Sequence, residues 1–80
     1  MEIKLGQIKD IVNRGRKIFS VCKCCKCVNF YLNRECFKCG HDEFITDNDL
    51  IKKEIEDTFQ FYEEQGLKEE EIKDIVIRIA

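Results

Sequence analysis

The residues of this chain that could do chemistry are its cysteines. Six cysteines occur in 80 residues, and all of them lie between Cys22 and Cys39. They form three Cys-x-x-Cys pairs, two of which overlap: Cys22 with Cys25, Cys24 with Cys27, and Cys36 with Cys39. This spacing places both sulfurs of a pair on the same side of a tight turn, where they can bind a metal ion. In a reducing compartment, paired cysteines indicate metal binding rather than disulfides.

The pair Cys36 and Cys39 is the strongest half of the predicted metal site. Gly40 follows it and allows the positive φ that comes after a second ligand. One further pair would complete a tetrahedral set of four thiolates. Four soft thiolates in a closed site suit a structural Zn²⁺, with iron as the less favoured metal.

Either overlapping pair could supply the other two ligands. The pair at Cys24–Cys27 leaves eight residues before Cys36, enough for a hairpin, and the pair at Cys22–Cys25 leaves ten. The residue after the second ligand is Val28 in the first register and Lys26 in the second, and a β-branched residue disfavours positive φ. We favour the first register for its shorter loop and keep the second as the alternative metal pair.

The stretch from Cys24 to Gly40 resembles the compact rubredoxin-type zinc ribbon, in which two knuckles flank an aromatic hairpin of about this length. The ribbon of the small zinc protein of H/ACA ribonucleoproteins is similar in spacing. The resemblance covers about 17 of the 80 residues. It implies one zinc ion with a structural role, held by Cys24, Cys27, Cys36 and Cys39.

Three residues near this set have open roles. His41 is a possible substitute ligand, but the cysteines suffice, so we expect it to have no metal role. In the favoured register Cys22 and Cys25 are not metal ligands. They could then be spare ligands, redox-active thiols or small apolar side chains. We expect the last, with Cys25 the more reactive because lysines lie nearby in the sequence.

The elements that must position the cysteines follow from hydrophobic periodicity. Apolar residues at a spacing of three and four predict a helix over 4–14, which Gly15 ends. Runs rich in β-branched and aromatic residues predict strands over 17–22, 28–32 and 43–46. The residues of the helical stripe are Leu5, Ile8, Ile11 and Val12.

Two helices are predicted after the ribbon. The polar cluster 46–49 caps the first, which ends at Gln65 and Gly66, and the second follows Leu67. The first stripe is Leu50 or Ile51, Ile55, Phe59 and Tyr62, and the second is Ile72, Ile75, Val76 and Ile79. Phe61 and Ile77 fall outside the stripes, as part of a broad core face or as partner contacts.

These elements predict a small, metal-stapled α+β fold in one domain. It consists of an N-terminal helix (1–16), a zinc ribbon with a short antiparallel β-hairpin (17–46) and a C-terminal helical hairpin (47–80). A chain of this length buries little apolar surface, so we expect the metal to stabilise it.

Charge is divided unevenly along the chain. Residues 1–41 carry nine Lys/Arg against three Asp/Glu, and residues 42–80 carry five against thirteen. This asymmetry predicts either a nucleic-acid-facing half beside a partner-facing half, or ion pairs between the two halves. Basic residues within the ribbon would also offset the −2 charge of four thiolates around Zn²⁺. The candidate nucleic-acid contacts are Arg14, Arg16, Lys17, Lys23, Lys26, Arg34 and Lys38, with Phe30, Tyr31 and Phe37 for base stacking.

No catalytic constellation and no membrane-spanning run occur in the sequence, so we expect a cytoplasmic protein that is not an enzyme. The composition predicts a small regulatory or adaptor protein that binds nucleic acid, or a protein partner or itself through the acidic C-terminal helices. The alternative is a thiol redox or metal-handling protein that uses the two extra cysteines.

Overall fold

Eight elements follow one another along the chain, and the computed structural model describes all residues from 1 to 80. The order is β1 (Glu2–Lys4), α1 (Leu5–Asn13), β2 (Phe19–Cys22), β3 (Val28–Phe30), β4 (Phe44–Ile45), α2 (Asn48–Glu64), α3 (Glu69–Lys73) and β5 (Val76–Arg78). The strands form two antiparallel sheets, β1-β5 and β3-β2-β4. The small α+β fold with three helices and short antiparallel strands confirms the predicted class. None of the helices is long and apolar enough to cross a bilayer.

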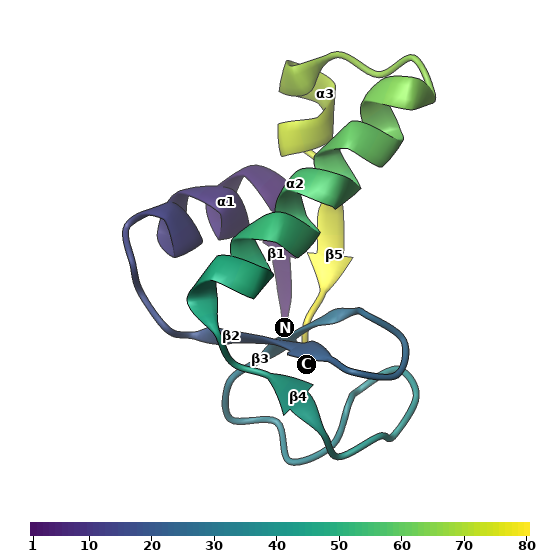
Figure 1. Cartoon of the computed structure of the whole chain (residues 1–80). Helices are drawn as coiled ribbons and strands as arrows, with labels where there is room; N and C mark the ends of the chain where they lie inside the picture. Colours follow the sequence, from purple (N-terminus) through teal and green to yellow (C-terminus); the bar gives the residue numbers. More distant parts are fainter.

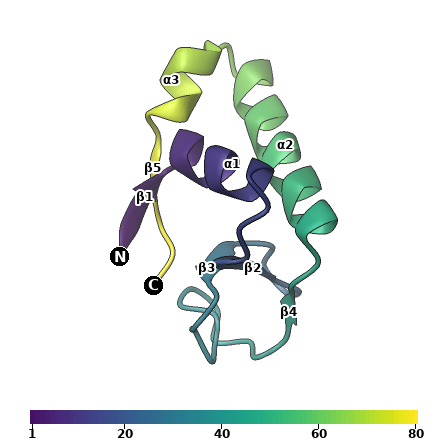
Figure 2. The same cartoon turned by 90° about the vertical axis from the view of Figure 1, so that its left-hand side faces the viewer.

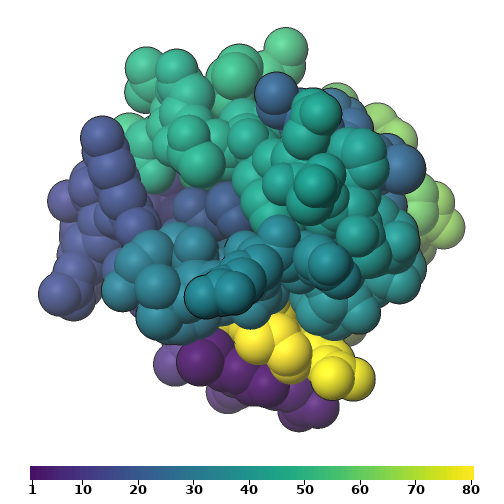
Figure 3. All heavy atoms as spheres, turned by 90° about the horizontal axis from the view of Figure 1, so that it is seen from below, coloured from purple at the N-terminus to yellow at the C-terminus, as the bar shows by residue number.

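The helices and the three-stranded sheet occupy opposite ends of the molecule (Figure 1). In the perpendicular view, α1 lies between the β1-β5 pair and α2, and the ribbon loops extend below the sheet (Figure 2). From below, the two ends of the chain lie side by side (Figure 3). The terminal ammonium of Met1 donates to the carbonyl oxygen of Ala80 at 2.9 Å.

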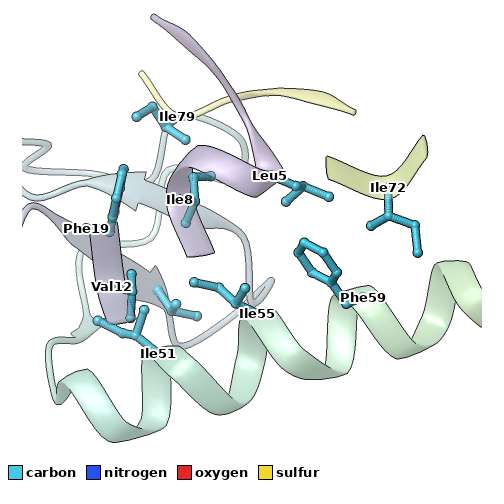
Figure 4. Packing of buried hydrophobic residues seen from close by; sticks show 10 residues of the cluster. Leu5, Ile8, Val12, Phe19, Ile51, Ile55, Phe59, Ile72 and Ile79 are labelled. Atoms are coloured by element: carbon cyan, nitrogen blue, oxygen red, sulfur yellow. The ribbon is translucent and has the colours of Figure 1, made fainter. Parts of the chain in front are cut away.

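One hydrophobic cluster joins the helices to the sheet (Figure 4). The buried residues of α1 and α2 are those of the predicted stripes, with Ile51 rather than the exposed Leu50 beginning the second stripe. Phe19 and Val21 of β2 continue the cluster into the ribbon, and Ile72 of α3 closes it. The sheet that carries the cysteines is therefore held by the same core as the helices.

Both predicted helix ends are confirmed. Gly15 and Gly66 take positive φ values of 80° and 91° after α1 and α2. Asp47 is the N-cap of α2, and its carboxylate accepts hydrogen bonds from the amides of Asp49 and Leu50. These bonds satisfy two of the four amides that a helix start leaves without partners.

Replacing Asp47 with alanine is expected to lower the free energy of unfolding by about 1 kcal/mol, because the two amides lose their acceptor. Thermal denaturation followed by circular dichroism should show a Tm lower by roughly 4–8 °C. The control is Asp49→Ala, which removes the same charge from the same helical turn but leaves the cap. Equal losses in both variants would show that charge, and not capping, accounts for the effect.

The C-terminal segment corrects the sequence prediction. The second helix of the expected hairpin ends at Lys73, and Ile75, Val76 and Ile79 do not continue it. Val76–Arg78 instead pairs with Glu2–Lys4 as an antiparallel strand. Alternating β-branched residues suit a strand as well as a helical stripe, and pairing with the distant N-terminus decides between them.

Candidate metal centre

Four cysteine sulfurs converge at one end of the ribbon. The sulfurs of Cys22, Cys25, Cys36 and Cys39 all lie within 4.8 Å of one another. Two contacts are shorter, with Cys22 Sγ 3.5 Å from Cys39 Sγ and Cys25 Sγ 3.5 Å from Cys36 Sγ. A tetrahedron of Zn–S bonds of about 2.3 Å would put its sulfurs about 3.8 Å apart. The four thiols are thus positioned to bind a metal ion, in a manner compatible with a zinc-ribbon-like site.

The two halves of the cluster share one backbone conformation. In the first, the amide of Lys26 donates to the carbonyl of Cys22, and the amide of Cys22 donates to the carbonyl of Cys27. The second repeats this pattern fourteen positions later, as Gly40 to Cys36 and Cys36 to His41. We call these turns, residues 22–27 and 36–41, the first and second knuckle.

This repeated geometry matches the alternative pair, Cys22 and Cys25, to the pair of the second knuckle. The residue after the second sulfur has a positive φ in both knuckles, 61° at Lys26 and 78° at Gly40. In the register that we favoured from loop length, this position would be Val28, whose branched Cβ opposes a positive φ. The structure accordingly groups Cys22–Cys25 with the second knuckle and leaves Cys24 and Cys27 outside the cluster.

Sulfur ionisation differs within the cluster. Burial opposes ionisation of Cys22, but backbone N–H groups of its own knuckle outweigh burial and lower its pKa. Burial likewise opposes ionisation of Cys36, yet backbone N–H groups and the Asn29 amide bring its pKa to about 6. These two sulfurs are the buried ones of the cluster. In both cases the N–H donors favour the thiolate form, which a metal ligand must take.

Their neighbours behave in the opposite way. Burial raises the pKa of Cys25 far above its ordinary value. The amide of His41 lowers the pKa of Cys39, but burial and the contact with the Cys22 sulfur leave it raised. Each close sulfur pair therefore combines an acidic thiol with one that keeps its proton. Metal binding would displace the remaining protons.

Asn29 supports the cluster from β3, and nothing in the sequence pattern pointed to it. Its side chain is fully buried, and its amide nitrogen donates to the Cys27 carbonyl at 3.2 Å and to Cys36 Sγ at 3.4 Å. Its amide oxygen accepts from the Phe37 amide at 3.1 Å and from Asn33 at 3.0 Å. Both donors and both acceptor sites of Asn29 are satisfied, so it orients the second knuckle against β3.

Asn33 extends this network to the end of the chain. Its amide nitrogen also donates to the Ile79 carbonyl at 2.7 Å, and the Phe30 amide donates to the same carbonyl at 3.0 Å. The residue after β5 is thereby hydrogen-bonded to β3 and to the turn that follows it, and the hairpin predicted between the two cysteine pairs is instead formed by β2 and β3 around the first knuckle.

The remaining candidate ligands lie apart from the four sulfurs. Cys24 is exposed and Cys27 is half-buried, so these two, and not Cys22 and Cys25, are the thiols left over. Cys25, which was expected to be a small apolar side chain and the more reactive of two leftover thiols, lies within the four-sulfur cluster. His41 lies in a separate group with two exposed carboxylates, Asp42 and Glu43.

The basic residues predicted to contact nucleic acid are all exposed, but they are distributed over several hollows of the surface. Lys26 and Lys38 line one cleft, Lys17 lines a second and Arg14 lines a third. The other three, Arg16, Lys23 and Arg34, line none of these hollows. The structure also brings Arg78 of β5, which was not predicted as a contact, into the cleft of Lys26 and Lys38.

Ion pairing between the basic and acidic halves is sparse. Lys23 lies 3.9 Å from Glu43, and Lys4 lies 3.5 Å from Asp74. Both pairs are exposed, and such pairs contribute little to stability. The charge asymmetry of the sequence is therefore mostly left on the surface.

The three aromatic residues predicted for stacking have different environments. Phe30 packs against the hydrophobic cluster, with its ring edge-to-face against Tyr31 at 5.0 Å between centroids. Tyr31 is exposed. Phe37 is half-buried, and the guanidinium of Arg78 lies over its ring at 5.7 Å from the centroid.

Comparison of this chain with protein-family models, curated proteins and solved structures found no match.

Proposed function

We propose that this protein is a small non-catalytic zinc-ribbon protein with a regulatory or adaptor role, and that it binds nucleic acid through basic residues beside the metal site. The proposal rests chiefly on one observation: two knuckles of identical backbone conformation bring four sulfurs together, and a lysine from each knuckle lines the same cleft. The metal would set the relative position of the two lysines.

Zinc is the metal that best fits this set of donors. Four thiolates form a closed tetrahedral site, which leaves no position for water or substrate and is typical of structural zinc. The same sulfurs would accept iron, the less favoured alternative. The contact of the first knuckle with β2 and of the second with Asn29 gives a bound ion a direct effect on folding.

Nucleic acid is the partner class favoured by the cations of the ribbon and of β5 that pair with no acidic side chain. Three exposed cations meet in one cleft, and no carboxylate lines it. Contacts between lysine or arginine and phosphates supply most non-specific affinity for nucleic acid and make it depend on salt.

A protein partner is the second candidate, favoured by an exposed face of α2. Leu50 and Phe61 are 50% and 56% exposed, and they lie eleven residues apart, which places them on the same side of the helix. Glu54 and Asp57 lie between them on that side. Self-association or capture of a partner through this acidic, partly apolar face is compatible with the adaptor role.

The salt dependence of oligonucleotide binding tests the proposed function. A fluorescent single-stranded oligonucleotide should bind the zinc-loaded protein at low salt, and log K should fall against log salt with a slope of about −2 for three phosphate contacts. Anisotropy titrations between 50 and 200 mM salt measure this slope. An absence of binding at low salt, or an affinity that salt leaves unchanged, would refute nucleic-acid binding. Salt-insensitive self-association by sedimentation would then favour the α2 face.

A further inference from the structure

A cleft of about 430 Å³ opens where the two knuckles meet α2 and β5. Its volume lies within the range of small-ligand sites in proteins. Lys26 and Lys38 come from the two knuckles and Arg78 from β5, and none of the ion pairs of the structure involves them. Figure 1 shows β5 and the loop between β2 and β3 on the same side of the molecule. Arg78 Nε donates to the main-chain oxygen of Ala80 at 2.9 Å, and no acidic side chain lines the cleft. The cleft therefore presents three cations that have no carboxylate side chain as partner.

The charge of a bound metal does not cancel this potential. Zinc with four thiolates carries −2, and it would lie beside the two knuckle lysines. Arg78 reaches the cleft from β5, which is outside both knuckles. Its charge, together with those of Lys26 and Lys38, exceeds that of the metal site. The cleft keeps a positive surplus that suits an anionic ligand.

The walls of the cleft are mostly apolar and include flat rings. Seven of its eleven lining residues are hydrophobic, among them Phe37 and Tyr62. The guanidinium of Arg78 lies over the ring of Phe37, and such arginine–aromatic pairs offer planar surfaces for a nucleobase. Thr58 and Tyr62 add hydroxyl groups from α2. A nucleotide matches both properties, whereas an acidic peptide matches only the charge.

We propose that this cleft binds one nucleotide of a single-stranded nucleic acid, with its phosphate against Lys26, Lys38 and Arg78 and its base against Phe37. The proposal rests on the proposed nucleic-acid function and assigns it a location. A single strand is required because bases within a duplex are already stacked and paired, whereas an unstacked base can enter a pocket.

Three variants and two oligonucleotides test the assignment. Arg78→Gln removes a cleft cation, and Lys53→Gln removes an exposed cation of α2 that lines no hollow. Phe37→Leu keeps an apolar side chain but removes the ring. Each variant is titrated, after its zinc content is verified, with a short single-stranded oligonucleotide and with the same phosphate chain carrying abasic sites.

Wild-type protein is expected to bind the abasic chain roughly tenfold more weakly, and Phe37→Leu should remove most of that difference. Arg78→Gln should weaken binding of the intact oligonucleotide about fivefold and reduce the salt slope by about 0.7, while Lys53→Gln changes neither.

If Arg78→Gln binds the oligonucleotide as tightly as wild type and with the same salt dependence, the cleft is not the binding site, but the proposed nucleic-acid function still holds. No binding by wild type would overturn both. Equal affinity of wild type for intact and abasic chains, or stronger binding of a polyglutamate peptide in competition, would also overturn the assignment of a nucleotide. If Phe37→Leu fails to fold, the Arg78 and abasic comparisons decide the matter.

Discussion

Replacing Cys25 with serine is expected to abolish tight zinc binding and to remove the cooperative unfolding transition of the protein. The substitution takes one of four thiolates from the proposed site, and zinc binding to such sites contributes on the order of 10 kcal/mol to folding. That is comparable to the whole stability of an ordinary domain, about 5–15 kcal/mol. Zinc content after dialysis and thermal denaturation followed by circular dichroism measure the two effects. Removing the metal from the natural protein with a chelator should have the same consequence.

The control for this experiment is the neighbouring cysteine. Cys24 is exposed and lies outside the four-sulfur cluster, so Cys24→Ser should keep one zinc ion per chain and change the Tm by no more than a few degrees. We do not expect the pair Cys24 and Cys27 to replace Cys22 and Cys25 as ligands. In that register the residue after the second ligand is Val28, which disfavours a positive φ, whereas the structure has its positive φ at Lys26. Loss of zinc from Cys24→Ser together with retention by Cys25→Ser would show that the other register is correct.

Substituting Asn29 with alanine is expected to lower the free energy of unfolding by about 3 kcal/mol. The part-buried amide of Phe37 would lose its acceptor and the buried Cys36 Sγ one of its donors, and a buried polar group without a partner costs about 1–3 kcal/mol. The small cavity left by the side chain adds to this loss. Since Asn29 also orients a proposed ligand, zinc affinity should fall about 10- to 100-fold.

Urea denaturation of the zinc-loaded protein and competition with a chromophoric chelator measure these two effects. Asn13, at the end of α1, is exposed and provides a matched control, with an expected change within about 0.5 kcal/mol for Asn13→Ala. If Asn29→Ala were as stable as Asn13→Ala and bound zinc equally well, the hydrogen-bond network would have no supporting role.

Local patterns were sufficient to predict most of the elements. The stripes of α1 and α2, the capping cluster at Asp47 and the glycine after each helix correspond to the observed elements, because the residues concerned lie within one or two turns of each other. The strands of the ribbon were also located, although each is shorter than expected. At these positions side-chain periodicity and backbone preference agree.

The secondary-structure prediction was wrong where an element depends on contact with a segment distant in the sequence. Residues 75–79 have apolar positions that suit either a helix or a strand, and only the availability of β1 as a partner makes the strand. Gly6 belongs to the same region: a Cβ there would lie 2.9 Å from the Cβ of Lys73, so its small size permits the close packing of α1 and α3. No feature of the neighbouring sequence indicates that contact.

For the metal centre too, some features could be predicted from the sequence and others depend on the tertiary structure. The six cysteines and their spacing already indicated two knuckles around a thiolate site, because the chemistry of sulfur and the reach of a Cys-x-x-Cys turn are local properties. The choice between the overlapping pairs depended on which residue takes the left-handed conformation after the first knuckle, and the two pairs differ there by only two positions. Pairing of β2 with both β3 and β4 positions the first knuckle so that the sulfurs of Cys22 and Cys25 lie beside those of Cys36 and Cys39. The cleft beside the centre is likewise a product of tertiary structure, since Arg78 reaches it only because the end of the chain returns as a strand along the first residues.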